Sequence, residues 1–213
     1  KQGSVIDLEA AERGTSVYFT QRVVPMLPEI ISNDLCSLRP NEDRFCLVCK
    51  TVVDKNGTLK DSIFFEAQIN SKARLTYENL SEEIEKDKLN KTYSRSIKNL
   101  LEIYERLKRN KENRGALELE VPFYVPKFNN NKIAKFTSSE RTVTHMMIEE
   151  FMLAANIATA EICLKFNMPS LYRVHPKPTE DDIEKLYKSL AIFGYSVPIS
   201  REITPKDVQI ILD

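Results

Sequence analysis

The alternation of apolar and polar residues predicts a β-hairpin in the first third of the chain. Every second residue is apolar or small in residues 43–54, and the same period returns in residues 58–70. Side chains two positions apart on an extended strand lie on one face, so both segments are predicted to be strands. Asn56-Gly57 between them is typical of a tight turn. The positions expected to share a face are Phe45, Leu47, Cys49, Thr51 and Val53 on the first strand, and Ile63, Phe65, Ala67 and Ile69 on the second.

Apolar residues at three-to-four spacing predict helices over much of the remaining chain. Asp7 and Thr179 are placed to cap two of them, because a side-chain oxygen just before a helix accepts an amide hydrogen bond. Gly14 and Gly115 are placed to end two of them, since glycine readily adopts the left-handed conformation found there. Pro28 suits the first turn of another. The expected helices cover residues 7–13, 28–34, 76–88, 92–115, 140–166 and 179–194.

The helix expected at residues 140–166 is apolar almost all round, which predicts a buried, central position. Ser138 and Ser139 are placed to cap it. Within it lie Glu149, Glu150 and Asn156, and Glu149 and Asn156 share one stripe. Buried carboxylates and amides must be hydrogen-bonded. Two interpretations stay open: a structural network that bonds Glu149 or Asn156 to a loop, or a pocket wall that contacts a polar ligand.

Further strands are expected at residues 116–125, 132–137 and 170–175, the first two joined by a turn at three asparagines, 129–131. No internal repeat is present. The pattern predicts a mixed α/β (α+β) chain with one core, in which antiparallel hairpins pack on the long central helix.

Composition narrows the possible functions only slightly. The 213 residues include 31 basic and 31 acidic side chains, so the formal net charge is zero. This balance removes a global attraction to nucleic acid but leaves room for a local basic groove. No apolar run approaches the roughly 20 residues of a membrane-spanning helix, and we expect no membrane contact.

Cys46 and Cys49 have the spacing of a metal-binding pair. On a strand, however, residues three apart point to opposite faces, so two ligands could not meet at one ion. We therefore interpret them as small apolar residues of the core and expect no bound metal. Four cysteines without a disulfide pattern favour a reducing compartment, and we expect a cytoplasmic protein.

Two short stretches carry side chains suited to single-stranded nucleic acid. Tyr172, Arg173 and His175 end the strand expected at 170–175, where a tyrosine can stack on a base and a cation can pair with phosphate. His175 equally suits a histidine bonded to backbone. Arg74, in the segment SKARLTY, adds a cation beside a tyrosine at a strand-to-helix junction.

Five stretches, taken in order, resemble the catalytic RNB domain of the ribonuclease II and ribonuclease R family, and the ribonuclease R branch most. They are DLEAAERGTSVYFTQRVVPMLPEIISNDLCSLRPNEDRF, SKARLTYENL, RGALELE, IEEFMLAANIATA and LYRVHPKP. The first is long and specific, and the others gain weight from their shared order. The resemblance covers residues 1–196. At residues 81–112 and 120–137 it lies mainly in the pattern of residue types, and it hardly extends to residues 197–213.

The resemblance implies processive 3′→5′ hydrolysis of single-stranded RNA, with Mg²⁺ held by a cluster of aspartates. In the family, the Asp-rich metal motif lies upstream of the matching segments, and an arginine segment that reaches the scissile phosphate lies downstream. We therefore expect neither catalytic nor metal-binding residues in these 213 residues, which would be a central part of the domain and inactive alone. The family's flanking cold-shock and S1-type domains have no counterpart here.

RGTSVYF resembles the family segment whose tyrosine packs against the last nucleotides, and this role is carried onto Tyr18. Arg13 opens the same motif and is expected to contact RNA with it. The following residues would line the RNA channel.

Two alternatives remain open. One is a catalytically silent RNA-binding or interaction module, and the other is an unrelated α/β domain with structural polar stripes. Strand edges left open by a partial sheet could also pair chains into a non-physiological oligomer.

Overall fold

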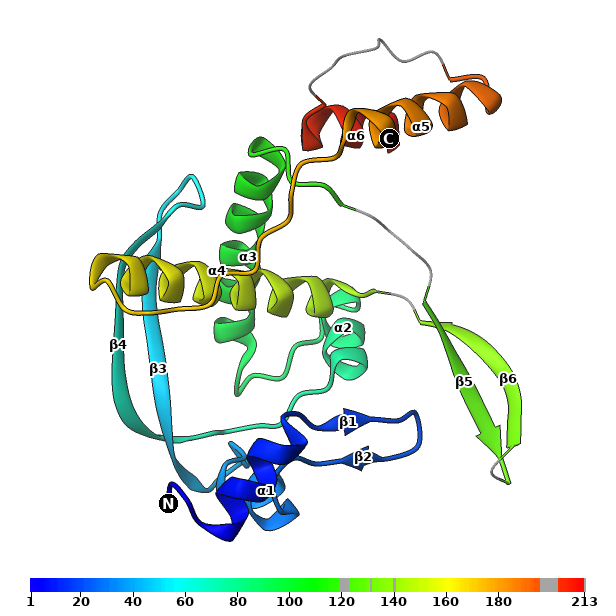
Figure 1. Cartoon of the computed structure of the whole chain (residues 1–213). Helices are drawn as coiled ribbons and strands as arrows, with labels where there is room; N and C mark the ends of the chain where they lie inside the picture. The colour runs from blue at the N-terminus through cyan, green and yellow to red at the C-terminus, as the bar shows by residue number, and fades with distance from the viewer. Residues whose placement is uncertain (119–122, 131, 140, 196–202, 213) are drawn as a thin grey trace. The chain divides into compact units, whose positions relative to one another are not determined.

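The computed structural model describes residues 1–118, 123–130, 132–139, 141–195 and 203–212 (Figure 1). Helices and two-stranded hairpins make up the chain, which confirms the predicted mixed α+β class. The elements in chain order are α1 (Val5–Arg13), β1 (Val17–Tyr18), β2 (Val23–Val24), the π-helical segment η1 (Ile30–Leu35), β3 (Asp43–Val53), β4 (Leu59–Asn70), α2 (Tyr77–Glu85), α3 (Ser94–Asn113), β5 (Phe123–Asn129), β6 (Lys132–Ser139), α4 (Val143–Lys165), α5 (Glu180–Ile192) and α6 (Pro205–Leu212).

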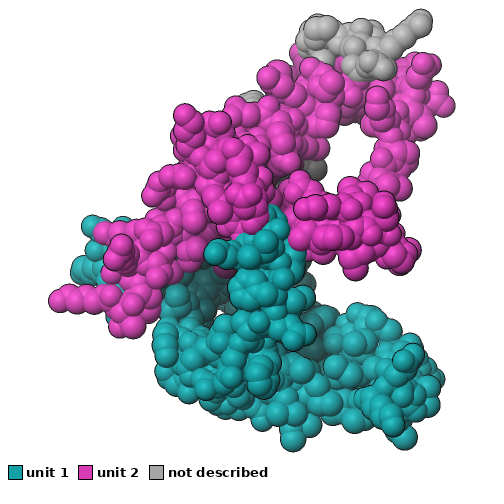
Figure 2. Space-filling view, turned by 90° about the vertical axis from the view of Figure 1, so that its left-hand side faces the viewer, with its two compact units in different colours: residues 1–50, 62–90, 122–146 teal, residues 51–61, 91–121, 147–213 magenta. Residues whose placement is uncertain are grey.

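The chain divides into two compact units instead of the single core expected (Figure 2). The first unit contains residues 1–50, 62–90 and 122–146, and the second contains residues 51–61, 91–121 and 147–213. Most of the buried apolar side chains belong to the second unit. In the described part of the chain they are Leu80, Ile97, Tyr104, Leu107, Met147, Ala154, Ala158 and Ile183.

Capping residues fix several helix ends in the described part of the chain. Thr179 and Asp182 form a reciprocal capping box at α5, which confirms the expected cap. At α1 the cap is Ser4, not Asp7 as expected. The Asp7 carboxylate instead accepts a hydrogen bond of 2.8 Å from the Gly3 amide, so it works from inside the first turn. Gly14 ends α1 in the left-handed conformation with φ 67°, as predicted.

The hairpin of β3 and β4 is present, with Gly57 at φ 76° in its turn. The predicted face is only partly covered, because Phe45 and Leu47 are 87% and 71% exposed while Cys49 is half-buried. The alternation of exposed and covered residues changes phase along β3. Residues 43–50 of this strand belong to the first unit and residues 51–53 to the second. All four cysteines are free thiols.

Two boundaries near β5 and β6 differ from the prediction. Residues 116–118 are irregular, and residues 119–122 lie outside the described part. Ser138 and Ser139 belong to β6 and do not cap α4, which begins at Val143. Ser138 pairs with Tyr124 across the β5–β6 hairpin. Strand pairing therefore holds the backbone of Ser138 extended, at a position where a helix cap was expected. The expected start of the helix at residue 140 also lies outside the description.

The helix α4 is covered on one side only, although it was expected to be buried all round. Met147, Ala154 and Ala158 are buried, whereas Met152 and Leu164 are 61% and 62% exposed. None of the helices in the described ranges combines the length and apolarity needed to cross a membrane.

The strand expected at residues 170–175 is wrong. Residues 169–179 are irregular, and Leu171 and Val174 are almost completely exposed. No described strand pairs with this stretch, and prolines, which lack an amide hydrogen, bound it on both sides at Pro169, Pro176 and Pro178.

Candidate nucleic-acid interface

A tight turn between β1 and β2 presents two aromatic side chains to solvent. Tyr18 is 78% exposed and Phe19 is 56% exposed. The Phe19 amide donates to the carbonyl of Arg22 at 2.9 Å, which closes the turn. The Arg22 guanidinium lies 5.9 Å from the centre of the Phe19 ring, within the range of a cation–π contact. The turn thus offers two ring faces and a cation without burying any of them.

Arg13 is held close to the end of β2. Its Nε bonds Glu9 Oε1 at 2.8 Å, and its Nη1 donates to the carbonyl of Pro25 at 3.2 Å. Part of its hydrogen-bonding capacity is therefore used within the first unit. Ser16 supports the β1–β2 hairpin, since its hydroxyl accepts a hydrogen bond of 2.9 Å from the Met26 amide.

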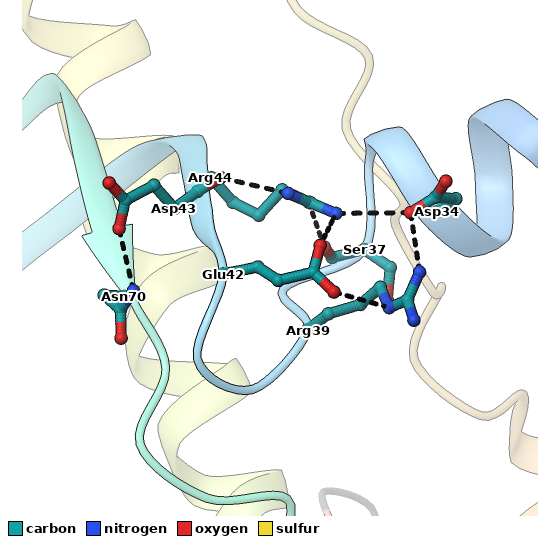
Figure 3. Close-up of polar contacts among 7 residues, drawn as sticks. All are labelled: Asp34, Ser37, Arg39, Glu42, Asp43, Arg44 and Asn70. Carbon is teal, nitrogen blue, oxygen red and sulfur yellow. Dashed lines mark hydrogen bonds and ion pairs between the residues drawn. The ribbon is translucent and has the colours of Figure 1, made fainter.

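A cluster of two arginines and two carboxylates ties η1 to the start of β3 (Figure 3). Arg39 and Arg44 both contact Asp34 Oδ1, at 2.8 and 3.2 Å. Both arginines also pair with Glu42. The hydrogen bond from Arg39 holds the pKa of the Asp34 carboxyl below its ordinary value. Because the four charges balance, we assign this cluster to structure.

Asp43 fastens the two strands of the long hairpin beside that cluster. One carboxylate oxygen accepts a hydrogen bond from Gln68 Nε2 at 3.0 Å. The other accepts a hydrogen bond from Asn70 Nδ2 at 2.7 Å (Figure 3). Arg74 follows β4 in an exposed loop. Asn41 donates its amide to the Ser71 carbonyl at 2.7 Å, which anchors the start of that loop.

His145 is part of a polar network at the start of α4. Its ring stacks on Tyr77 with centroids 4.0 Å apart, and Nδ1 lies 2.7 Å from the Thr142 hydroxyl. The Thr144 hydroxyl bonds Ser81 at 2.8 Å and donates to the Tyr77 carbonyl at 3.0 Å. This network joins the first turn of α4 to α2 within the first unit.

In the second unit, Glu150 rather than Glu149 is the buried carboxylate of α4. Its side chain is 8% exposed and pairs with Lys111 of α3 at 3.0 Å. Glu149 and Asn156 are both exposed. Glu150 also lines a pocket of about 300 Å³. The pocket is lined by Gly57, Thr58, Leu59, Leu107, Asn110, Arg114, Glu150, Leu153, Ala154, Ile157 and Glu161.

Tyr172, Arg173 and His175 lie together in the irregular segment of the second unit, and all three are exposed. Arg13, Tyr18 and Arg74 belong to the first unit. The six predicted RNA contacts are thus divided between the two units, with three residues in each. Sequence reasoning assigned no role to Phe19 or Arg22, although the aromatic pair beside an arginine was a visible signal.

The side chains of the described ranges do not fit a resident metal. No three His, Cys, Asp or Glu residues gather there in a way that could hold an ion.

The turn between β1 and β2 thus presents two accessible rings and an arginine, the kinds of group that contact a nucleic acid strand. The family model of the RNB domain matches residues 1–211, and the chain belongs to that family. It is 38% identical over 213 residues to Ribonuclease R of Escherichia coli strain K12. That alignment covers 98% of this chain and 26% of the relative. The chain thus spans about a quarter of the curated relatives' length.

Solved structures agree with this assignment. The apo form of Mycoplasma genitalium RNase R matches with a TM-score of 0.92 at 26% identity, over 100% of this chain and 34% of that one. Structures of the same protein were solved with ribose-methylated single-stranded RNA and with double-stranded RNA. Yeast Ssd1, described as a pseudonuclease, shares the fold with a TM-score of 0.67 at 21% identity over 99% of this chain and 27% of that one.

Proposed function

We propose that these residues form part of a processive 3′→5′ exoribonuclease that degrades single-stranded RNA in the cytoplasm. In this proposal the segment from β1 to η1 lines the RNA channel, and Tyr18 holds the 3′ end. The observation that carries it is the exposure of Tyr18 and Phe19 on a closed turn, in a motif shared with the ribonuclease R branch. Aromatic rings stack on any base, so they suit an enzyme without sequence preference.

Arg74, Tyr172, Arg173 and His175 complete the proposal as further RNA contacts. All four are exposed, and the cations among them can pair with phosphate while the rings stack. Glu149 and Asn156 are exposed on α4 and do not line the pocket that Glu150 borders, so we assign them no contact with RNA. Glu150, with its part-buried partner Lys111, is assigned to structure.

The hydrolytic step itself requires groups beyond those that the described residues bring together. A divalent ion such as Mg²⁺ would supply an activated water and stabilise the leaving oxygen. The residues of this chain would orient the strand and hold its end. A catalytically silent RNA-binding module is the second candidate, favoured by the fold that the chain shares with a protein described as a pseudonuclease.

The 213-residue chain alone is expected to leave RNA intact. Labelled poly(A) incubated with the purified chain and Mg²⁺ should remain full length on a denaturing gel, because the described residues gather no metal-binding set. Release of nucleotides that EDTA abolishes would contradict this prediction.

Tyr18→Ala, in the complete polypeptide that contains these residues, is expected to lengthen the limit product by a nucleotide or more. Stacking holds a base with about 1–3 kcal/mol, and the shortest RNAs have few other contacts to replace it. Cleavage of long RNA should change little. Tyr18→Phe should keep the parent's limit product, since it retains the ring.

Sequencing gels of the end products decide this prediction. Tyr195→Ala provides the matched control, because Tyr195 is a similarly exposed tyrosine of the second unit at 60% exposure. Identical limit products for parent and Tyr18→Ala would mean that Tyr18 does not hold the RNA end.

A further inference from the structure

The β5–β6 ribbon has two chemically different faces. Residues directly opposite in an antiparallel pair share a face. Lys127 lies opposite Lys135, and beyond a bulge Asn129 lies opposite Lys132. The alternation of β5 places Phe123, Lys127 and Asn129 on one side, so all three lysines share that side. We call it the basic face; its described members are Phe123, Val125, Lys127, Asn129, Lys132, Lys135 and Thr137.

The opposite side is the apolar face, which consists of Tyr124, Pro126, Phe128, Ile133, Phe136 and Ser138. Three of its rings remain accessible, with Tyr124 at 59%, Phe128 at 38% and Phe136 at 62% exposure. The basic face also carries an accessible ring, since Phe123 is 68% exposed. The ribbon thus combines cations and aromatic surface over a short length of chain.

The charge of the ribbon departs from that of the whole chain. Residues 123–139 contain three lysines and no Asp or Glu, whereas the full sequence is neutral. Lys127 and Lys135 are directly opposed, an arrangement that destabilises a strand pair by like-charge repulsion. A bound polyanion would relieve that repulsion. Three cations in a row with an exposed ring at one end match what a single nucleic acid strand requires.

We propose that the basic face of the β5–β6 ribbon is a second RNA-contact site, distinct from the Tyr18 turn, that binds the phosphates of a single strand. Phe123 stacks on a base at one end of the face, and the lysines pair with successive phosphates. This proposal rests on the proposed function, because it takes RNA as the ligand. It adds a site whose energy is mainly electrostatic, whereas the Tyr18 turn acts through stacking.

Salt dependence separates the two kinds of contact. Each lost phosphate contact lowers the slope of log affinity against log salt by about 0.7 for single strands. The triple variant Lys127→Ala, Lys132→Ala and Lys135→Ala should therefore reduce that slope by about 2 and weaken binding at low salt by about tenfold or more. Fluorescence anisotropy of labelled oligo(A) in EDTA, from about 50 to 200 mM salt, measures both quantities.

Two matched variants control for charge and folding. The triple arginine variant at the same positions keeps the charge and should bind like the parent. The triple variant Lys88→Ala, Lys91→Ala and Lys98→Ala removes three exposed lysines elsewhere and should leave the slope within about 0.7 of the parent's. Tyr18→Ala should weaken binding without changing the slope.

The outcomes distinguish failure of the ribbon from failure of the proposed function. A parent that binds oligo(A) while the ribbon variant keeps the full slope overturns the ribbon site alone. A parent that binds no RNA removes both proposals. A ribbon variant with unchanged slope but an altered sedimentation mass would assign the ribbon to a contact between protein chains, which also overturns it.

Discussion

Lys111→Ala is expected to lower the free energy of unfolding by about 3 kcal/mol, because it leaves the buried Glu150 carboxylate without its cation. Lys111 and Glu150 side chains are only 14% and 8% exposed, and their charged atoms lie 3.0 Å apart. Removing one partner of such a pair leaves a desolvated charge behind, and that penalty exceeds what the pair gains when it is intact. Urea unfolding followed by circular dichroism measures the change.

Replacing the other partner, Glu150, should lower the free energy of unfolding by less. After Glu150→Ala, Lys111 still has Glu118 at 3.7 Å, so its charge keeps a partner. We expect a loss of about 1–2 kcal/mol, from burial of an incompletely paired cation. Glu161→Ala is the matched control, since Glu161 is an exposed carboxylate on the same helix and should shift stability by no more than about 0.5 kcal/mol.

A double replacement tests the mechanism directly. Lys111→Met with Glu150→Leu removes both charges and restores apolar volume, so it should recover most of the stability that Lys111→Ala loses. Equal losses for the double variant and for Lys111→Ala would show that packing, rather than an unpaired charge, is responsible.

The same helix shows why the polar stripe was predicted one residue away from the buried carboxylate. Glu149 and Glu150 are adjacent, and α4 is apolar on nearly every side, so periodicity could not choose between them. The choice is made by Lys111, 39 residues earlier in the chain. Nothing local to α4 carries that information.

Elements set by local chemistry were predictable. Thr179 caps α5 and Gly14 ends α1, because caps depend on residues within one turn of each other. The strand expected at residues 170–175 was not predictable in the same way, since a strand exists only where another chain segment pairs with it. The residues of a stretch such as Leu171–Val174 cannot reveal whether a pairing partner is near.

The candidate site divides along the same line. The motif around Tyr18 indicated the aromatic turn, and the structure adds Phe19 and Arg22 to it. The basic face of the ribbon escaped the sequence analysis because its lysines are spread over nine residues and come together only through strand register. Register is fixed by pairing across the turn, which composition does not encode.

The turn between β3 and β4 is only partly predictable from the sequence. Its conformation follows from its own residues, but its contact with α3 does not. Asn56-Gly57 predicts a residue with positive φ, and Gly57 has φ 76°. Asp54 holds the turn, because its carboxylate accepts the Asn56 and Thr58 amides at 2.8 and 3.0 Å. The turn also contacts α3 closely: Asn110 Nδ2 donates to the Asn56 carbonyl at 3.1 Å. Gly57 itself is buried against the backbone of that helix.

Gly57→Ala should therefore destabilise the chain by about 3 kcal/mol, as the sum of left-handed strain and overpacking. A methyl group there would lie 2.2 Å from the Arg106 carbonyl oxygen and 2.8 Å from Asn110 Cβ, so helix or turn must move. Gly194→Ala isolates the strain alone, because Gly194 has φ 83° but no atom within 4 Å of the added carbon. That control should cost only about 1 kcal/mol. Equal losses in urea unfolding would mean that the close approach to α3 contributes nothing and that conformation alone requires glycine at 57.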